Sequence, residues 1–400
     1  MGDQDGGLYQ PEFPDHWERR PLYDLAHWVN GLAFRQINFN PTGRPVIKIA
    51  ELKNGVTGQT KFTQQTFDDS VRVRRGDLLF SWSGQPETSI DAFWWRGPEG
   101  WLNQHLFRIT PAGGVDRTFF YYLLRYLNPN FVGIARNKQT TGLGHVTRRD
   151  LEAIEAALPP FSEQRAIAEV LGALDDKIDA NQRIVETVER VAIYISWSKM
   201  ATTTVGEVAG VHRDFVSASV FANQEVEHFS LPAFDSSRSP RVENGTAIKS
   251  GKFLLNGPTV LVSKLNPHIP RVWMAVPTGA RSAVTSTEFV GLVPSYDYPV
   301  EVLWSLCASA QFSSQLAEMV RGTTGSHQRV SVDDVLTLKV PDPEEIGEDV
   351  REVVAAAVGL AGTLRQESLR LATLRDALLP RLLSGDLQVR NFESLEAQAV

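Results

Sequence analysis

At 400 residues the chain is longer than one hydrophobic core usually accommodates, so its length favours two or three domains. Hydrophobic residues make up 42% and charged residues 22%, which is typical of a globular protein and argues against a disordered chain. Cys307 is the only cysteine, which excludes an intramolecular disulfide framework and a thiolate zinc cluster and favours a reducing cytoplasm.

The net charge of −7 is unevenly distributed along the chain. Residues 1–150 hold 18 Lys and Arg against 15 Asp and Glu, and residues 201–340 hold 11 against 12. Residues 151–200 hold 5 against 9, and residues 341–400 hold 6 against 11. Two regions can therefore tolerate a phosphate backbone and two would repel it. We expect no leader and no membrane-spanning segment, since residues 1–10 are polar and no 18 uncharged apolar residues follow one another.

The first part of the chain predicts short strands and then a helix. Val46–Ile49 and Asp77–Ser81 have the composition of strands, and Phe119–Leu127 that of an aromatic-rich helix. Between the strands, arginines alternate with valines, which would place the cations on one strand face just before a glycine. Phosphate is their natural ligand, with a solvated strand face as the alternative. These candidates are Arg72, Arg74 and Arg75.

Polar and basic residues gather in the loop after the first helix. Amide side chains can pair with adenine and Arg or Lys with guanine, while Thr hydroxyls and backbone N–H groups hold phosphate. The sequence therefore predicts a DNA-contacting loop here, with a plain turn as the alternative. The candidates are Arg136, Lys138, Gln139, Thr140, Thr141, Gly142 and His145, with Ser83 after the second strand.

One pattern in this part has the outline of a catalytic site. Asp15 and the run Glu51-Leu52-Lys53 match a metal-dependent nuclease core, in which carboxylates hold Mg²⁺ and a lysine steadies the phosphate. The simpler interpretation makes Asp15 a turn residue and Glu51 the polar end of a strand. No metal is predicted, because the histidines lack ligand spacing. No cofactor is expected either, because no glycine-rich phosphate loop is present.

A strict apolar seam follows Pro159 and Pro160. Ser162 is expected to cap a helix that runs to about Ser198, roughly 54 Å at 1.5 Å per residue. The seam steps alternately by four and three, the period of a coiled coil. Asn181 on it either fixes the register or reaches water at the edge. The seam residues are Ile167, Leu171, Leu174, Ile178, Asn181, Val185, Val188, Ala192 and Ile195.

The next part of the chain repeats the first. An offset of 183 residues aligns Leu22 with Val205 and Tyr121 with Trp304, whereas Asp77–Ser81 meets Thr259–Ser263 at 182. Chance similarity of two α/β segments is the alternative. Thr259–Ser263 and Phe289–Val293 predict strands, Val302–Met319 predicts a helix, and a second loop follows. Its DNA candidates are Arg321, Thr323, Thr324, Ser326, His327, Gln328 and Arg329, with Lys264 after the strand.

A second seam of the same period lies in the C-terminal segment. Its residues are Val353, Ala357, Leu360, Leu364, Glu367, Leu371, Leu374 and Leu378. Because the chain must reverse to bring this helix back, we expect the two helices to form an antiparallel coiled coil that holds two β-rich domains apart.

Two motifs resemble conserved regions of type I restriction-modification specificity subunits. LPPFSEQRAIA at 158–168, continuing to LDDKI at 174–178, is similar to the family's central region, and LRDALLPRLLSG at 374–385 is similar to its C-terminal region. DHWE at 15–18 and GDLLFS at 76–81 resemble parts of the family's target-recognition domains. One departure is that the second copy has VPDPEEI at 340–346 in place of the Pro-Pro-Phe-Ser-Glu-Gln-Arg signature.

The resemblance implies an α+β protein with two repeated α/β target-recognition domains, 1–157 and 201–343, joined by conserved helices at 158–200 and 344–400. It implies double-stranded DNA with a bipartite asymmetric site, two methyltransferase (modification) subunits and, where present, restriction subunits as partners. Methyl donor, Mg²⁺ and ATP would then belong to the partner subunits. The partner-docking residues implied are Phe161, Glu163, Gln164, Arg165, Leu171, Leu174, Leu378, Leu379 and Leu382. A nuclease and a coiled-coil scaffold without DNA contact remain as alternatives.

Overall fold

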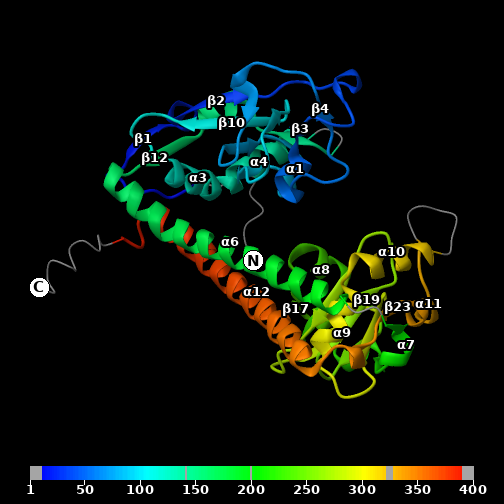
Figure 1. The fold of residues 1–400 in the computed structure, drawn as a ribbon. Helices are drawn as coiled ribbons and strands as arrows, with labels where there is room; N and C mark the ends of the chain where they lie inside the picture. Colours follow the sequence, from blue (N-terminus) through cyan, green and yellow to red (C-terminus); the bar gives the residue numbers. More distant parts are fainter. Residues whose placement is uncertain (1–10, 140–141, 199–200, 321–327, 390–400) are drawn as a thin grey trace, which may run out of the picture. The chain divides into compact units, whose positions relative to one another are not determined.

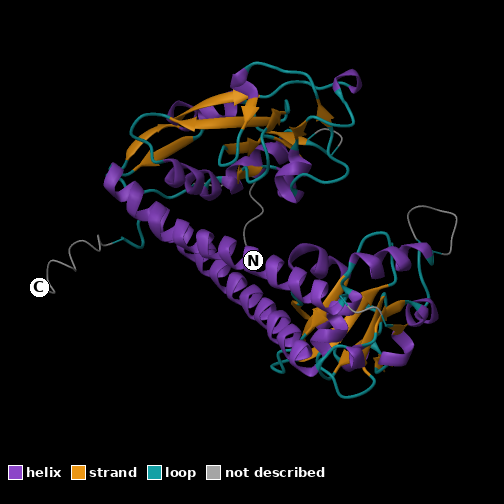
Figure 2. Cartoon of the chain, viewed as in Figure 1, coloured by secondary structure: helices purple, strands orange, loops and turns teal. Residues whose placement is uncertain are grey.

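The computed structural model describes residues 11–139, 142–198, 201–320 and 328–389. By its contacts the chain divides into two compact units, Met1–Ile178 with Leu369–Val400, and Asp179–Ser368. Each unit combines β-sheet with helices (Figures 1 and 2). These bounds divide both long helices between the units, so the domain limits inferred from the sequence stay a prediction.

The first unit contains two four-stranded sheets and two short ribbons. One sheet has the order β2-β10-β6-β8, entirely antiparallel, and the other has the order β4-β3-β9-β5 with β3 and β9 parallel. The ribbons pair β1 with β12 and β7 with β11. The strands are β1 (Glu18–Pro21), β2 (Ala26–Asn30), β3 (Arg44–Ile47), β4 (Phe62–Thr63), β5 (Arg72–Val73), β6 (Leu78–Ser81), β7 (Ser83–Gly84), β8 (Asp91–Trp94), β9 (Gly100–Leu102), β10 (Leu106–Pro111), β11 (Gly144–His145) and β12 (Glu155–Leu158).

The second unit contains the same two sheets in the same order. The antiparallel sheet is β14-β22-β19-β20, and the mixed sheet is β17-β16-β21-β18 with one further edge strand, β15. The ribbon of β13 with β23 repeats β1 with β12. The strands are β13 (Thr202–Thr204), β14 (Ala209–His212), β15 (Phe215–Val216), β16 (Glu225–Phe229), β17 (Arg241–Asn244), β18 (Lys252–Leu255), β19 (Thr259–Ser263), β20 (Val272–Ala275), β21 (Ser282–Thr285), β22 (Phe289–Pro294) and β23 (Lys339–Pro341).

Apart from α2, the helices occupy matching places in the two copies. In the first they are η1 (Leu22–Leu25), α1 (Ile49–Asn54), α2 (Pro86–Ser89), α3 (Arg117–Tyr126), α4 (Asn128–Asn137) and α5 (Arg148–Ala153). In the second they are α7 (Val205–Val208), α8 (Leu231–Ser237), α9 (Val300–Cys307), α10 (Ala310–Glu318) and α11 (Val332–Thr337). The short 3-10 turns η2 (Gln36–Asn38), η3 (Asp69–Val71), η4 (Ala218–Val220), η5 (Gly245–Ala247) and η6 (Pro343–Glu345) complete the set.

Equivalent hydrogen bonds fix the register of the repeat. Leu22 N–H donates to the Ile154 carbonyl at 2.8 Å, and Val205 N–H donates to the Leu338 carbonyl at 3.0 Å, 183 and 184 residues on. The capping box that opens α5, from Thr147 to Asp150, recurs in α11 184 residues later. The repeat predicted from scattered apolar pairs is therefore present in the fold.

Three local predictions were wrong. Ile49 opens helix α1 and does not end a strand, and the Glu51 carboxylate accepts the Lys48 N–H at 3.0 Å as a helix cap. The expected helix Val302–Met319 is two helices, because the Ser309 side chain accepts the Phe312 N–H and starts a new one. The first long helix begins before Ser162, because the Pro160 carbonyl already accepts the Gln164 N–H.

The long helices α6 (Phe161–Ser196) and α12 (Glu348–Leu383) pair in an antiparallel manner. Within the second unit Asn181 donates to the Glu367 carboxylate at 2.7 Å, and Glu189 pairs with Arg365 at 2.6 Å, so numbers rise along one helix as they fall along the other. All nine predicted seam residues of α6 are buried or partly buried, and Asn181 reaches the other helix, not water. The α6 seam is confirmed.

The predicted seam of α12 is confirmed only in part. Glu367 accepts a hydrogen bond from Asn181 of α6, and the other partly buried members are Ala357, Leu364, Leu371 and Leu378. The exposed members are Val353, Leu360 and Leu374. Val353 is 55% and Leu360 is 45% exposed, whereas the residues after them, Val354 and Ala361, are completely buried. At the start of α12 the sequence has two adjacent apolar stripes with the same seven-residue period, and there the stripe one position later carries the packing. Within the described residues, no helix is long and apolar enough to cross a membrane.

Candidate nucleic-acid interface

In the first copy, three segments meet around the backbone of Trp82. β7 pairs with β11, so that Ser83 lies opposite His145. The Val146 N–H donates to the Trp82 carbonyl at 2.8 Å, and the Trp82 N–H donates to the His105 carbonyl at 3.3 Å. The predicted loop around Gly142 is therefore tied to residues that precede it by about 40 and 60 positions.

The side chains at this meeting point are aromatic and polar. The rings of Trp82 and His105 lie 5.7 Å apart, and the Trp82 indole N–H donates to the Asn30 amide oxygen at 3.2 Å. The Gln104 amide nitrogen lies 3.2 Å from His105 Nε2. Amide and imidazole groups supply both donors and acceptors, which is what recognition of base edges requires.

The second copy builds the same backbone arrangement with different side chains. Leu265 lies opposite Arg329 in an antiparallel bridge, and the Val330 N–H donates to the Lys264 carbonyl at 3.1 Å. The Lys264 N–H donates to the Glu288 carbonyl at 2.8 Å. Lys264, Glu288 and Arg329 thus take the places of Trp82, His105 and His145. The two copies therefore share the backbone arrangement and differ in the side chains that it carries.

Ion pairs anchor the first loop at its beginning. Arg136 pairs with Glu87 at 2.6 Å, and this hydrogen bond lowers the pKa of the Glu87 carboxyl. The Lys138 ammonium contacts both carboxylate oxygens of Asp150, at 2.5 and 2.6 Å. Burial raises the pKa of Asp150, but the hydrogen bonds from Lys138 and Thr147 outweigh it and lower that pKa.

The rest of this loop is more open. The exposed Gln139 amide donates to the Gly142 carbonyl at 2.7 Å, and Gly142 has φ +87°, a conformation that glycine adopts without strain. Thr140 and Thr141 lie outside the described residues. Base contact by Gln139 and His145 stays a prediction.

Lys138→Ala is expected to loosen the loop and not to change the reading of one base, because Lys138 is committed to Asp150. Amide hydrogen exchange of residues 142–146 should rise roughly 2- to 5-fold, the equivalent of about 0.5–1 kcal/mol for a partly exposed ion pair. Because folding lowers the pKa of Asp150, this contribution is fully present above the ordinary Asp pKa and is lost as the pH falls from there through the lowered pKa of the folded state. Arg149→Ala, at an exposed position close to the same loop, is the control; unchanged exchange in Lys138→Ala would contradict the anchoring role.

The second loop is described only at its end. Arg321, Thr323, Thr324, Ser326 and His327 lie outside the described residues. The half-buried Gln328 accepts the Asn266 N–H at its carbonyl, at 2.8 Å. Arg329 binds both carboxylate oxygens of Glu288. Sequence reasoning missed Glu288, since nothing local in the sequence ties this acid to a loop 41 residues later.

The arginines before Gly76 are engaged within the chain. Arg72 lies 2.9 Å from the Asp69 carboxylate and over the Trp101 ring, and Arg74 lies 3.0 Å from Asp69. Arg75 donates to the Arg96 carbonyl. The strand includes only Arg72 and Val73, so the predicted strand face of three arginines was wrong. Contact of these arginines with phosphate stays a prediction, with the solvated surface as the alternative.

The predicted docking residues on the long helices fall into two groups. Gln164 is 2% exposed; its side chain accepts the Asp116 N–H at 2.8 Å and donates to the carbonyls of Gly114 and Pro159. Its role is therefore to attach α6 to the first domain. Leu171 and Leu382 are also buried there, and Leu174, Leu378 and Leu379 are partly buried. Phe161, Glu163 and Arg165 remain accessible at the start of α6.

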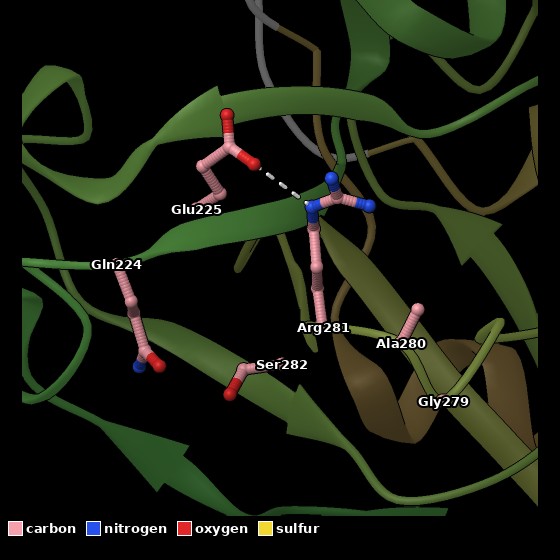
Figure 3. A pocket seen from close by; sticks show the side chains of 6 residues that line it. All are labelled: Gln224, Glu225, Gly279, Ala280, Arg281 and Ser282. Carbon is pink, nitrogen blue, oxygen red and sulfur yellow. Dashed lines mark hydrogen bonds and ion pairs between the residues drawn. The ribbon is translucent and has the colours of Figure 1, made fainter.

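An open depression of about 710 Å³ lies in the second copy, where β16 and β21 begin. Figure 3 shows Arg281 paired with Glu225 at 3.1 Å, with Gln224 and Ser282 nearby. The described residues contain no group of three His, Cys, Asp or Glu side chains suited to a metal ion. The nuclease outline also loses Glu51, whose carboxylate caps α1.

Comparison with known families supports the sequence motifs. The model of the type I restriction modification DNA specificity domain matches residues 14–190. The chain is 26% identical over 210 residues to the type I restriction enzyme EcoBI specificity subunit of Escherichia coli, covering 52% of this chain and 42% of that protein. A putative type I specificity subunit of Methanocaldococcus jannaschii, MjaX, is 25% identical over 188 residues, 44% of its length. The matched part of the chain thus spans less than half of the length of each of these two relatives.

Two longer matches extend over both copies. The MjaVIII specificity subunit of Methanocaldococcus jannaschii is 20% identical over 423 aligned residues, 95% of each chain. The crystal structure of a type I restriction-modification S subunit from M. genitalium superposes with a TM-score of 0.51 at 15% identity, covering 92% of this chain and 96% of that one. The superposition on the S subunit shows that this chain shares its fold.

Proposed function

We propose that this chain, which belongs to the family of type I restriction-modification specificity subunits, selects the DNA sites that a methylating complex modifies. One observation carries the proposal: the segments around Trp82 and Lys264 hold loops by the same backbone hydrogen bonds but present different side chains. Two such domains would each read one half of an asymmetric bipartite site in double-stranded DNA.

This chain would recognise the DNA sequence, and its partner subunits would catalyse the reactions. The nuclease outline is weakened, since the Glu51 carboxylate is engaged as a helix cap. Methyl donor, and Mg²⁺ and ATP where a restriction subunit is present, would bind the partner subunits. The nearly neutral recognition segments fit a protein whose tight DNA binding depends on a complex with more basic partners.

We place the docking of two modification subunits on the long helices. In the second unit α6 exposes Ile184, Val191 and Tyr194, and α12 exposes Val353 and Leu360. Ile184 with Val191, and Val353 with Leu360, repeat at seven residues, the spacing that another helix recognises by knobs-into-holes packing. Amphipathic helices of the modification subunits are the occupants proposed, with the accessible Phe161 and Arg165 as a second contact point.

The test compares the chain alone with the chain in complex with its modification subunits, using plasmid DNA and a methyl donor. We expect sequence-specific methylation and tight, salt-dependent DNA binding only from the complex. Methyl transfer by the chain alone, or plasmid cleavage by the chain with Mg²⁺, would contradict the division of labour. A complex without salt-dependent DNA affinity would favour the scaffold alternative.

A further inference from the structure

Arg329 is held by a carboxylate in a defined orientation. Its Nε donates to one Glu288 oxygen at 3.1 Å and its Nη2 donates to the other at 3.0 Å. Both bonds use the same edge of the planar guanidinium. The adjoining edge, formed by Nη1 and the second hydrogen of Nη2, is consequently turned away from Glu288. The Arg329 side chain is 55% exposed, and that of Glu288 is 29% exposed.

Backbone contacts fix both residues independently of this ion pair. The Glu288 carbonyl accepts the Lys264 N–H, Leu265 bridges to Arg329, and the next residue, Val330, donates to the Lys264 carbonyl. Both Cα positions are thus set by the central segment 264–265. An arginine whose attachment and guanidinium plane are both fixed loses little entropy when it binds a ligand.

We propose that Arg329, oriented by Glu288, reads a guanine in the half-site of the second domain; this rests on the function proposed above. Two parallel N–H donors on the outer edge match the O6 and N7 acceptors of guanine in the major groove. Because Glu288 balances the charge of Arg329, the pair gains less from a phosphate than an unpaired arginine would. Glu288 is a positioning residue here.

The first domain lacks this pair at the equivalent place. There the positions of Arg329 and Glu288 are occupied by His145 and His105, with Trp82 in place of Lys264. The two domains therefore differ in charge where their backbones agree. At this place in the fold, guanine reading by a held arginine is therefore expected of the second domain and not of the first.

The experiment maps genomic methylation by the complete complex with wild-type chain, Arg329→Lys and Glu288→Gln. Arg329→Lys keeps the charge but loses the planar fork, so discrimination at one G·C position of one half-site should fall roughly 5- to 150-fold. Its binding should keep the wild-type dependence on salt. Glu288→Gln should lower discrimination at the same position while making binding more dependent on salt, because the charge of Arg329 is no longer balanced. A merely structural role for Glu288 would not steepen the salt dependence.

Arg281→Lys is the matched control, because Arg281 also pairs with a glutamate through Nε but lies just before β21 of the mixed sheet (Figure 3). It should leave the methylated sequence unchanged. The proposal is overturned if Arg329→Lys keeps full discrimination, if the position it relaxes is A·T, or if Arg281→Lys relaxes the same position. A wild-type complex without any sequence preference would instead refute the proposed function itself.

Discussion

Val354→Asp is expected to unfold the second unit, whereas Val353→Asp is not. Val354 is completely buried in the core that joins α12 to the second domain, and Val353 is 55% exposed. Burying a valine contributes about 1.5–3 kcal/mol, and the aspartate adds an unpaired buried charge. We expect a loss of about 4 kcal/mol or more for Val354→Asp.

The neighbouring substitution is a close control. Both positions lie in the early turns of α12, which begins at Glu348, so helix propensity and the favourable effect of an acid near a helix N-terminus are nearly equal in the two variants. Val353→Asp should change the free energy of unfolding by no more than about 0.5 kcal/mol. Urea unfolding measures the difference. Equal losses in the two variants would show that the register of α12 is incorrect.

Asp175→Ala is expected to detach α3 from both long helices. Asp175 on α6 accepts the Tyr122 hydroxyl of α3 at 2.6 Å and the Arg375 guanidinium of α12 at 2.5 Å. Burial and the hydrogen bond to Asp175 raise the pKa of Tyr122, so this phenol stays protonated and remains a donor. Removing the carboxylate leaves Arg375 largely buried, with Asp376 as its remaining ion-pair partner among the described residues.

The expected loss is about 3 kcal/mol, the lower part of the range for a broken buried pair, since the two side chains keep some solvent contact. Asp176→Ala, at the exposed neighbouring position, should change stability by no more than about 0.5 kcal/mol. Tyr122→Phe should fall between them, at about 1 kcal/mol for one hydrogen bond. Hydrogen exchange of α3 and urea unfolding report both effects. If Asp175→Ala and Asp176→Ala behave alike, Asp175 does not connect the three helices.

Most of the fold could be predicted from periodic patterns that extend over many residues of the sequence. The seam of α6 was predictable because its apolar residues offer one stripe, interrupted only by Asn181. In α12, Val353 and Val354, like Leu360 and Ala361, offer two adjacent stripes with one period. Only the neighbouring domain decides which one is buried.

The site was less predictable, because composition indicates where cations gather but not what already binds them. Lys138 was predicted to contact a base and the arginines at 72 and 74 to contact phosphate, yet Asp150 and Asp69 bind them within the chain. Gln164 lies in the motif attributed to docking, but its side-chain amide forms hydrogen bonds with three backbone groups. Glu288 was invisible to pattern reasoning because only the tertiary fold brings it to Arg329.

The most direct test of two separate recognition domains is methylation-site mapping with Gln139→Ala and Gln328→Ala complexes. Gln139 belongs to the first domain's loop and Gln328 to the second's, and each lost bidentate base contact should cost about 1–3 kcal/mol of discrimination. We predict a two-part wild-type site in which Gln139→Ala relaxes one half and Gln328→Ala relaxes the other. An uninterrupted site, or relaxation of the same half by both variants, would contradict the account.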